Sequence, residues 1–363
     1  EKLISMKNIL IVTGGSGGHV VPSTSLFEHL KNKFSVKMVS DLRGSKYINT
    51  EKFKYELIDV PNLFLKPYLL PINIFKYFLN IFQSIRFLKN NNTNIVISSG
   101  GYMTFPFCLA AFILQKKVFL FEPNSVLGRS NRFALKFSTK IICYDENLRN
   151  FPIKYNSKKV IIKPILKKEI YNLEKNIINL KKEIKKILII GGSQGASFFD
   201  ENITELIIEI SKKQNLEVIQ QISNINNLSS IKNKYDKSNI KYKFIEFTND
   251  SHKLYNGIDL AITRGGASTL SELSFLNIPF ISIPLPSARD NHQFYNSEFY
   301  YKKNCCWLIK QKEFEFNKFS KMIFEIFNDY KNYKEKFKNL EEITKKNTWN
   351  NINNKIIEII DEN

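Results

Sequence analysis

A chain of 363 residues, of which 43% are apolar and 24% charged, is long enough for two domains with separate hydrophobic cores, and this composition excludes a disordered protein. Its formal net charge of +20 favours an anionic partner such as a phosphate-rich substrate, an acidic lipid or a nucleic acid, although we attribute about half of the excess to a general drift of the composition toward lysine and asparagine. Four cysteines, two of them adjacent at Cys305 and Cys306, fit neither a zinc-site spacing nor a disulfide framework and predict buried free thiols.

The first half of the chain alternates short apolar runs with helical patterns, which predicts a mostly parallel sheet. We expect residues 41–44 to form a loop and residues 74–88 a helix whose apolar positions cover more than one face. Residues 90–115 carry no charge, but their glycines and proline favour a strand, a loop and a helix over a membrane span. The predicted strands are 9–12, 36–40, 55–60, 95–98, 118–121, 141–143 and 160–162.

A glycine-rich turn follows the first predicted strand. Residues 14–19 read Gly-Gly-Ser-Gly-Gly-His, and a helical pattern with Leu26, Phe27 and Leu30 comes next. Such a turn directs backbone N–H groups and a helix N-terminus at an anion, and glycine lets a ligand approach the backbone. The turn matches neither the dinucleotide fingerprint, which would need glycine at Val20, nor the Walker A loop, which needs a lysine. The sequence therefore predicts a phosphate-binding turn of another kind.

The strand–glycine–helix pattern recurs later in the chain. Residues 98–102 read Ser-Ser-Gly-Gly-Tyr after one strand, and residues 191–195 read Gly-Gly-Ser-Gln-Gly after another. This recurrence predicts two similar α/β domains, each with a glycine turn where open α/β sheets bind ligands. From Phe314 onward the tail is predicted to be helical, with Trp349 and Ile352 at core spacing. The predicted strands of this half are 187–190, 218–219, 242–247, 260–262 and 280–283.

Two polar segments of the second half suit a nucleotide sugar. Residues 263–272 read Thr-Arg-Gly-Gly-Ala-Ser-Thr-Leu-Ser-Glu, which places small residues and hydroxyls at a helix start and Glu272 one turn later, where it can accept from a ribose diol. A plain capping box from Thr269 to Glu272 is the alternative. Residues 290–293 read Asp-Asn-His-Gln and suit sugar hydroxyls, with a solvated loop as the alternative. No motif with metal-ligand spacing is present, so no metal site is expected.

These five motifs, in this order, resemble the MurG family of N-acetylglucosaminyltransferases, which convert lipid I into lipid II in bacterial cell-wall synthesis. The resemblance extends from about residue 7 to the C-terminal helix. It implies an α/β protein of GT-B fold, in which two Rossmann-like domains with parallel sheets face each other across a cleft. The expected domains are an acceptor- and membrane-facing domain 1–163, with a C-terminal helix 341–363 packing back on it, and a UDP-GlcNAc-binding domain 164–340.

The resemblance also implies an activity. It is the inverting transfer of GlcNAc from UDP-GlcNAc to the C4 hydroxyl of MurNAc in lipid I, which is undecaprenyl-pyrophosphoryl-MurNAc-pentapeptide. No cofactor is implied, because UDP-GlcNAc is a substrate, and a free divalent cation enters only as a stimulant. The implied partners are an anionic membrane surface and cell-wall synthesis proteins but no nucleic acid, with a peripheral location on the cytoplasmic face of the inner membrane. A related GT-B enzyme with another lipid or soluble acceptor, and a non-enzymatic nucleotide-sugar-binding protein, are the alternatives.

Site residues follow from the resemblance by their positions in the motifs. By position, Asn124 and the first glycine turn at Ser16, Gly17 and Gly18 approach the sugar and the diphosphates. The need for a base, together with the place of His19 on the first turn of a helix, makes His19 the expected catalytic base. Glu122 is the competing base, and a structural or phosphate-binding His19 is the other alternative. The residues implied to bind the donor are Lys167, Ser193, Thr248, Arg264, Ala267, Ser268, Thr269, Leu270, Ser271, Glu272, His292 and Gln293.

The chain departs from the family pattern in two places. The family's His-Glu-Gln-Asn is Phe-Glu-Pro-Asn at residues 121–124, and its Gly-Asn-Pro-Val-Arg is Ile-Lys-Pro-Ile-Leu at residues 162–166. The arginine expected on the donor is therefore replaced by Leu166. Lys167 can supply a point charge there but not a bidentate fork.

Residues 63–89 form an unusually apolar segment punctuated by Lys66, Lys76, Arg86 and Lys89. Apolar side chains flanked by cations suit a surface that dips into an anionic lipid leaflet. The alternative is that these aromatic residues pack in the core of the N-terminal domain.

Overall fold

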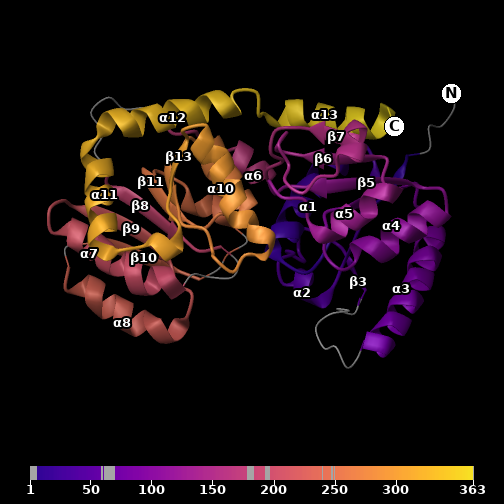
Figure 1. Cartoon of the computed structure of the whole chain (residues 1–363), viewed down its shortest axis with the longest axis horizontal. Helices are drawn as coiled ribbons and strands as arrows, with labels where there is room; N and C mark the ends of the chain where they lie inside the picture. Colours follow the sequence, from indigo (N-terminus) through magenta and orange to yellow (C-terminus); the bar gives the residue numbers. More distant parts are fainter. Residues whose placement is uncertain are drawn as a thin grey trace. The chain divides into compact units, whose positions relative to one another are not determined.

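The computed structural model describes residues 6–58, 60, 70–177, 184–192, 197–238, 240–246, 248 and 250–362. The chain divides into two compact units (Figure 1). The N-terminal unit comprises Glu1–Tyr171 and Thr348–Asn363, and the C-terminal unit comprises Asn172–Asn347. Residues 164–171 thus belong with the first unit, and residues 341–347 with the second.

The N-terminal unit is built on a parallel sheet that, in the described residues, has seven strands in the order β3-β2-β1-β4-β5-β6-β7. Its strands are β1 (Asn8–Val12), β2 (Ser35–Ser40), β3 (Glu56–Leu57), β4 (Ile95–Ser98), β5 (Lys117–Glu122), β6 (Lys140–Cys143) and β7 (Lys159–Ile161). Its helices are α1 (Gly17–Leu30), α2 (Leu42–Ser45), α3 (Leu70–Asn90), α4 (Thr104–Ile113), α5 (Arg129–Ala134), α6 (Lys168–Tyr171) and α13 (Trp349–Glu362). The predicted parallel sheet is confirmed.

One local expectation for this unit was wrong. Residues 41–44 are not a loop, because Leu42–Ser45 forms the single-turn helix α2. The side chain of Asp41 caps this turn by accepting a hydrogen bond from the Gly44 N–H at 2.7 Å. An aspartate before a short polar run is compatible with a loop or with an N-cap, and only the capping bond distinguishes the two.

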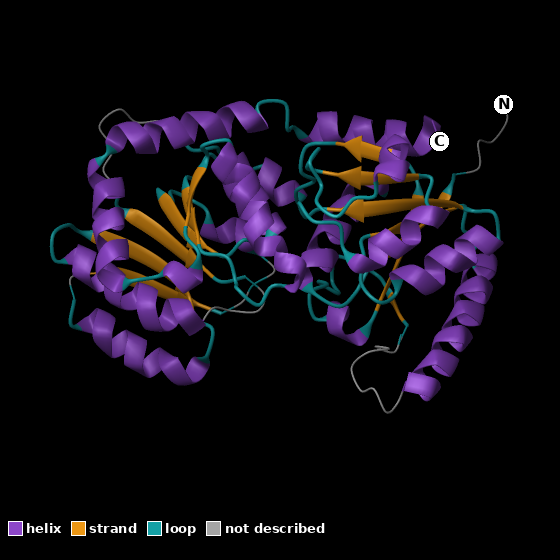
Figure 2. Cartoon of the chain, viewed as in Figure 1, coloured by secondary structure: helices purple, strands orange, loops and turns teal. Residues whose placement is uncertain are grey.

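Helices cover both faces of this sheet (Figure 2). Along β1, Ile9 and Ile11 pack toward α1 and α13, whereas Leu10 and Val12 pack toward α4 and α5 on the other face. Every β1 side chain after Asn8 is buried, which is why the strand reads as a continuous apolar run.

The C-terminal unit repeats this plan with a parallel sheet that, within the described residues, has six strands in the order β10-β9-β8-β11-β12-β13. Its strands are β8 (Lys186–Ile190), β9 (Leu216–Gln221), β10 (Ile240–Ile245), β11 (Leu260–Thr263), β12 (Phe280–Ser282) and β13 (Cys306–Leu308). Its helices are α7 (Thr204–Ser211), α8 (Ile225–Asp236), α9 (Ala267–Phe275), α10 (His292–Lys302), α11 (Phe316–Asn328) and α12 (Tyr330–Thr344). The edge strand β13 was not predicted, because a three-residue run carries too little pattern.

The last helix, α13, packs on the N-terminal unit. Its residues Ile352, Ile356 and Ile360 are buried in the same core as β1 and α1. The indole of Trp349 stacks on the buried imidazole of His29 in α1, with ring centroids 3.8 Å apart. Burial lowers the pKa of His29 to about 4, so this ring is neutral at physiological pH and stacks as an uncharged group.

The glycine turns lie where the strand order of each sheet reverses. In the N-terminal sheet the central strands β1 and β4 are neighbours, and each ends in a glycine turn. In the C-terminal sheet the equivalent neighbours are β8 and β11, which run into residues 191–192 and 264–266. Because ligands of open α/β sheets bind at the carboxyl ends of the strands at such a reversal, the fold itself indicates two candidate binding regions.

Alanine variants of two glycines test how closely the N-terminal turns pack. Gly15 and Gly101 both have positive φ, 83° and 90°, so alanine strains both by about 1–2 kcal/mol. A Cβ on Gly101 would lie 2.9 Å from the carbonyl oxygen of Gly14, whereas a Cβ on Gly15 meets nothing within 4 Å. We expect Gly101→Ala to lower the free energy of unfolding by about 1–3 kcal/mol more than Gly15→Ala. Equal losses in urea unfolding of the two variants would contradict this packing.

Candidate active site

The first glycine turn is held by a buried carboxylate. The Asp41 Oδ1 atom accepts hydrogen bonds from Gly15 N at 2.8 Å and from Gly44 N at 2.7 Å. Asp41 is only 3% exposed, and a Cβ on Gly44 would lie 2.8 Å from the Gly14 Cα, so α2 packs directly against the turn. Asp41 was not among the predicted site residues, although an acidic residue directly after the second strand was a usable signal.

A buried chain of hydroxyl groups connects the two N-terminal glycine turns. Ser23 of α1 donates to the Ser99 hydroxyl at 2.8 Å, and Ser99 donates to the Thr13 hydroxyl at 3.0 Å. The turns at residues 14–18 and 99–101 are therefore one assembly, with the N-terminus of α1 at Gly17 emerging from it. Ser16 is the N-cap residue of α1, and the N–H groups of Gly17 and Gly18 belong to the first helical turn, which lacks intrahelical partners.

His19 lies on the first turn of α1 and packs against the second glycine turn. A Cβ on Gly100 would lie 2.9 Å from the His19 Cε1 atom, so a larger residue at this position would displace the imidazole. Gly100 also has a φ of 104°, which other residues adopt at a cost. The structure thus brings the predicted His19, Ser16, Gly17 and Gly18 together at the end of β1.

Glu122 is fully buried at the end of β5, and both of its carboxylate oxygens are occupied. Oε1 accepts from the side-chain amide of Asn124 at 3.0 Å and from its backbone N–H at 3.3 Å. Oε2 accepts from Gly128 N at 2.8 Å and from Asn131 Nδ2 at 3.0 Å. Burial raises the pKa of Glu122 above its usual value, and these four donors offset this rise only in part. The carboxylate thus organises residues 122–131, including the predicted Asn124.

The third glycine turn, in the C-terminal unit, is held by an amide instead of a carboxylate. Gln221 Oε1 accepts from Gly191 N and from Gly192 N, both at 3.0 Å, and Gln221 Nε2 donates to Gly192 O at 2.9 Å. Gly192 has a φ of 76°, which explains the glycine there. The predicted residue Ser193 lies outside the described residues.

Glu272 lies in α9 and is only 4% exposed. Its Oε2 atom accepts from the Tyr255 hydroxyl at 2.6 Å and from Ser251 Oγ at 3.0 Å. Within the described part of the chain these bonds reach only Oε2, so Oε1 is left for another donor. Glu272 is therefore held by tertiary contacts, and the N-cap of α9 is Gly266 and not Thr269. Sequence reasoning missed Tyr255 and Ser251, which are distant from Glu272 along the chain.

Gly265 and Gln293 form a tight junction between the start of α9 and that of α10. A Cβ on Gly265 would lie 2.0 Å from the Gln293 carbonyl oxygen, so this position admits only glycine. Gln293 Oε1 accepts from Leu285 N at 3.0 Å and from Gly265 N at 3.3 Å. These two bonds engage the amide oxygen of Gln293, and its Nε2 donor takes no part in them.

The guanidinium of Arg264 is directed into the C-terminal unit. Its Nη1 donates to Ile283 O at 2.9 Å and to Gln311 Oε1 at 2.7 Å, and its Cζ atom lies 4.7 Å from the ring centroid of Phe199. Burial lowers the pKa of Arg264 to about 10, so it stays protonated at physiological pH. In this structure its side chain braces the loops around the site.

The remaining predicted residues divide between surface and interior. Ala267, Ser268 and Thr269 are partly exposed on the first turn of α9, whereas Leu270 and Ser271 are buried in the unit. The remaining three residues lie in loops or at a helix start: Thr248 Oγ1 accepts from Asp250 N, His292 Nδ1 contacts Arg289 O, and Lys167 precedes α6 in the N-terminal unit. Leu166, where the family arginine was expected, is buried.

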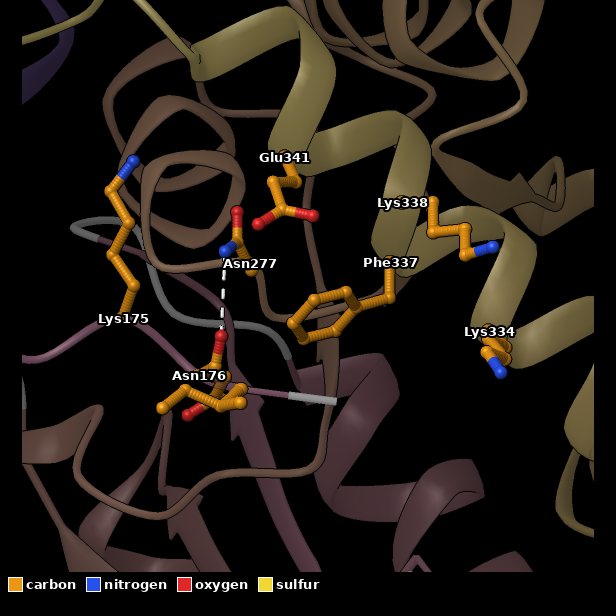
Figure 3. A pocket seen from close by; sticks show the side chains of 8 residues that line it. Lys175, Asn176, Asn277, Lys334, Phe337, Lys338 and Glu341 are labelled. Atoms are coloured by element: carbon orange, nitrogen blue, oxygen red, sulfur yellow. Dashed lines mark hydrogen bonds between the residues drawn. The ribbon is translucent and has the colours of Figure 1, made fainter. Parts of the chain in front are cut away.

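A separate pocket of about 400 Å³ opens between α12 and the residues that follow α9 (Figure 3). Asn277 points toward Asn176, to whose carbonyl it donates at 3.4 Å, and Lys338 and Glu341 of α12 line the other side. Asn277 lies beyond the C-terminal end of α9, roughly 13 Å along the helix from Ala267 at its start. The pocket therefore lies at the C-terminal end of α9, away from Gly266 and Ala267 at its start.

Neither a metal cluster nor a membrane-crossing helix is found in the part of the chain that the structure describes. No group of three or more His, Cys, Asp or Glu side chains there is arranged to hold a metal ion. Every helix among those residues falls short of the length and apolarity needed to cross a bilayer.

The fold defines a class of protein: two Rossmann-like units, each built on a parallel sheet, are the hallmark of GT-B-type proteins. A crystal structure of Acinetobacter baumannii MurG matches with a TM-score of 0.76 at 21% identity, covering 97% of this chain and 99% of that one. A UDP-GlcNAc 2-epimerase from Neisseria meningitidis, bound to UDP-GlcNAc, matches with a TM-score of 0.66 at 15% identity, covering 98% and 100%. These likenesses establish the fold.

Sequence comparison identifies the family. Residues 9–143 match the glycosyltransferase family 28 N-terminal domain, and residues 186–352 match its C-terminal domain. The chain is also 44% identical over 358 residues to the UDP-N-acetylglucosamine–N-acetylmuramyl-(pentapeptide) pyrophosphoryl-undecaprenol N-acetylglucosamine transferase of Pelagibacter ubique, covering 98% of this chain and 99% of the relative. The enzyme of the same name from Rickettsia bellii is 36% identical, with 92% and 95% covered. The chain belongs to glycosyltransferase family 28.

Substitutions of Glu272 and Tyr255 test the donor region. A charge-assisted hydrogen bond to a buried carboxylate is worth roughly 1.5–3 kcal/mol, so Glu272→Ala should raise the KM for UDP-GlcNAc about ten- to a hundredfold. Tyr255→Phe should raise it less, because Ser251 still holds Oε2. Glu209→Ala, which removes an exposed carboxylate paired with Lys212, is the matched control. If the KM of Glu272→Ala for UDP-GlcNAc stays within about twofold of the wild-type value, Glu272 has only a structural role.

Proposed function

We propose that this chain transfers GlcNAc from UDP-GlcNAc to the C4 hydroxyl of MurNAc in lipid I, with inversion at the anomeric carbon, to give lipid II. The observation that carries this proposal is the 44% identity, over nearly all of both chains, to a relative whose name states that reaction. The retained glycine turns, Glu272 and Gln293 support it. UDP release from UDP-GlcNAc in the presence of a lipid I analogue, and its absence with other lipid or soluble acceptors, tests it directly.

The donor is assigned to the C-terminal unit. The N-terminus of α9, opened by Gly266 and Ala267, offers backbone N–H groups and a positive dipole end to the UDP diphosphate. Glu272 Oε1 accepts from the ribose diol, and Gln293 Nε2 donates to a sugar hydroxyl. These donors stabilise the charge that develops on the departing UDP, since preorganised N–H groups act without reorganising during the reaction.

The acceptor is assigned to the N-terminal unit, with His19 as the base. The attacking hydroxyl must lose its proton as the new bond forms, which needs a base within hydrogen-bond reach. His19 sits at the carboxyl end of β1 beside the N-terminus of α1. Glu122 is less suited to act as the base, because both of its carboxylate oxygens already accept hydrogen bonds from the protein, four in all. We assign Glu122 instead to positioning Asn124.

Removal of the His19 imidazole should lower kcat by roughly 10²–10⁴-fold, the usual contribution of general base catalysis, with little change in UDP-GlcNAc binding. The pH profile of kcat/KM should also lose its acidic limb, because protonation of the base no longer limits the reaction. Steady-state kinetics of His19→Ala between about pH 5 and 9 measure both effects.

Glu122→Gln is the comparison for this experiment. It keeps the size of the side chain but disturbs the carboxylate that binds Asn124, Gly128 and Asn131, so we expect reduced stability with an acidic limb still present. A His19→Ala enzyme that retains more than about a tenth of the wild-type kcat would exclude His19 as the base and favour Glu122.

Recruitment to the membrane is assigned to α3, because a polyprenyl substrate stays in the bilayer. Phe75, Phe78 and Phe82 project from this helix into solvent, with Phe82 72% exposed. Other apolar side chains of the same unit are also exposed, namely Ile72, Leu79, Phe112, Ile113 and Phe133. With Lys76 and Arg86 on the same helix, this surface suits insertion into an anionic leaflet. The part of the predicted segment at residues 63–69, including Lys66, lies outside the described residues.

The membrane proposal is tested by combining Phe75→Ser and Phe82→Ser with Lys76→Glu and Arg86→Glu. We expect this variant to lose co-sedimentation with vesicles that contain anionic lipid, because both the apolar and the electrostatic contribution are removed, while UDP binding survives. Ile225→Ser with Lys237→Glu, on the surface of α8 in the other unit, is the matched control. Undiminished sedimentation of the folded α3 variant would refute the assignment.

A further inference from the structure

Arg43 occupies a defined place beside the two N-terminal glycine turns. Its Nη2 donates to Asp41 Oδ2 at 3.3 Å, and its guanidinium lies 4.7 Å from the ring centroid of Tyr102. Asp41 holds the first turn through Gly15 N, and Tyr102 directly follows the second turn. The arginine is thus fixed by Asp41, which binds the first turn, and by Tyr102, which follows the second turn.

The negative charge of Asp41 disfavours the binding of an anionic ligand at the first glycine turn. Its carboxylate is buried and takes the Gly15 N–H, so that donor is lost to a phosphate while a negative charge stands behind the turn. An anion approaching the N–H groups of Gly17 and Gly18 would be repelled by this charge, weakly screened because it is buried. Arg43 is the cation that offsets it, as the side chain paired with Asp41.

The remaining face of Arg43 is open. Its side chain is 48% exposed, and within the described part of the chain Asp41 is its only hydrogen-bond partner. A guanidinium that is stacked on one side and anchored at one N–H, with its other donors open, has the geometry that binds phosphate oxygens in a bidentate manner.

We propose that Arg43 binds the diphosphate of the acceptor, together with the N–H groups at the start of α1. This inference rests on the proposed function, since it takes the acceptor to be a polyprenyl diphosphate sugar. Asp41 and Tyr102 act as positioning residues: they set the direction of the guanidinium and hold both glycine turns against it.

Kinetics with a short-chain, water-soluble lipid I analogue test the proposal. Arg43→Ala should raise the KM for the acceptor about ten- to a hundredfold and make it less sensitive to salt, while the KM for UDP-GlcNAc stays unchanged. Arg43→Lys keeps the positive charge but loses the two parallel N–H donors of the guanidinium. Its KM for the acceptor should therefore lie between those of the wild type and Arg43→Ala. Lys46→Ala, an exposed cation at the end of the same short helix, is the matched control. An acceptor KM within twofold of wild type in Arg43→Ala, or an equal rise in both KM values, would overturn the inference.

A binding measurement separates this inference from the proposed function. Inorganic diphosphate is titrated against the full chain in the presence of saturating UDP, which occupies the donor region. Wild-type binding that weakens about tenfold or more in Arg43→Ala supports the anion site even for an enzyme that does not use lipid I. Binding that is absent in wild type or unchanged in the variant overturns it, whatever the acceptor kinetics show for the reaction.

Discussion

The closeness of two glycine turns at the reversal of the N-terminal sheet is the constraint on which the acceptor region depends. The Gly101 backbone approaches the Gly14 carbonyl so closely that no Cβ fits, and the His19 ring fills the space over Gly100. The buried hydroxyls of Ser23, Ser99 and Thr13 tie the same elements together. The two glycine turns and α1 thus contact one another, and these contacts hold the N-terminus of α1 and the imidazole of His19 in place.

Both units hold their first glycine turn with a side chain from the second strand or just after it, but the two side chains differ in charge. In each, a side chain that follows or ends the second strand binds the N–H groups of the glycine turn after the first strand: Asp41 in one unit and Gln221 in the other. The neutral amide adds no net charge at the C-terminal turn. The carboxylate makes the N-terminal turn negative, and a nearby cation is then needed if that turn is to receive the proposed diphosphate. The pairing of Asp41 with Arg43 is thus a consequence of the residue that braces the turn.

Sequence reasoning reached the fold because strong local patterns specify it. The apolar strands and the glycine turns can be recognised from short stretches of sequence, and their recurrence along the chain is enough to indicate two sheets. What it missed depends on contacts between distant segments. Tyr255 meets Glu272 across a loop, and Asp41 meets Gly15 from another strand, so neither shows in a local motif. The single-turn helix α2 and the three-residue strand β13 were missed because elements so short carry almost no periodicity.

Glu122 and Glu272 show why burial alone does not identify a functional carboxylate. Both are nearly inaccessible to solvent, and both stand in motifs that the sequence singled out. Glu122 accepts hydrogen bonds at both oxygens, so its bonding capacity is spent on residues 124–131 and the group acts as a structural tie. Within the described residues Glu272 is held through Oε2, by Tyr255 and Ser251, which fixes its orientation and leaves Oε1 for the proposed ligand donor. A carboxylate anchored at one oxygen is preorganised for recognition, because the protein has already ordered the side chain that the ligand will meet.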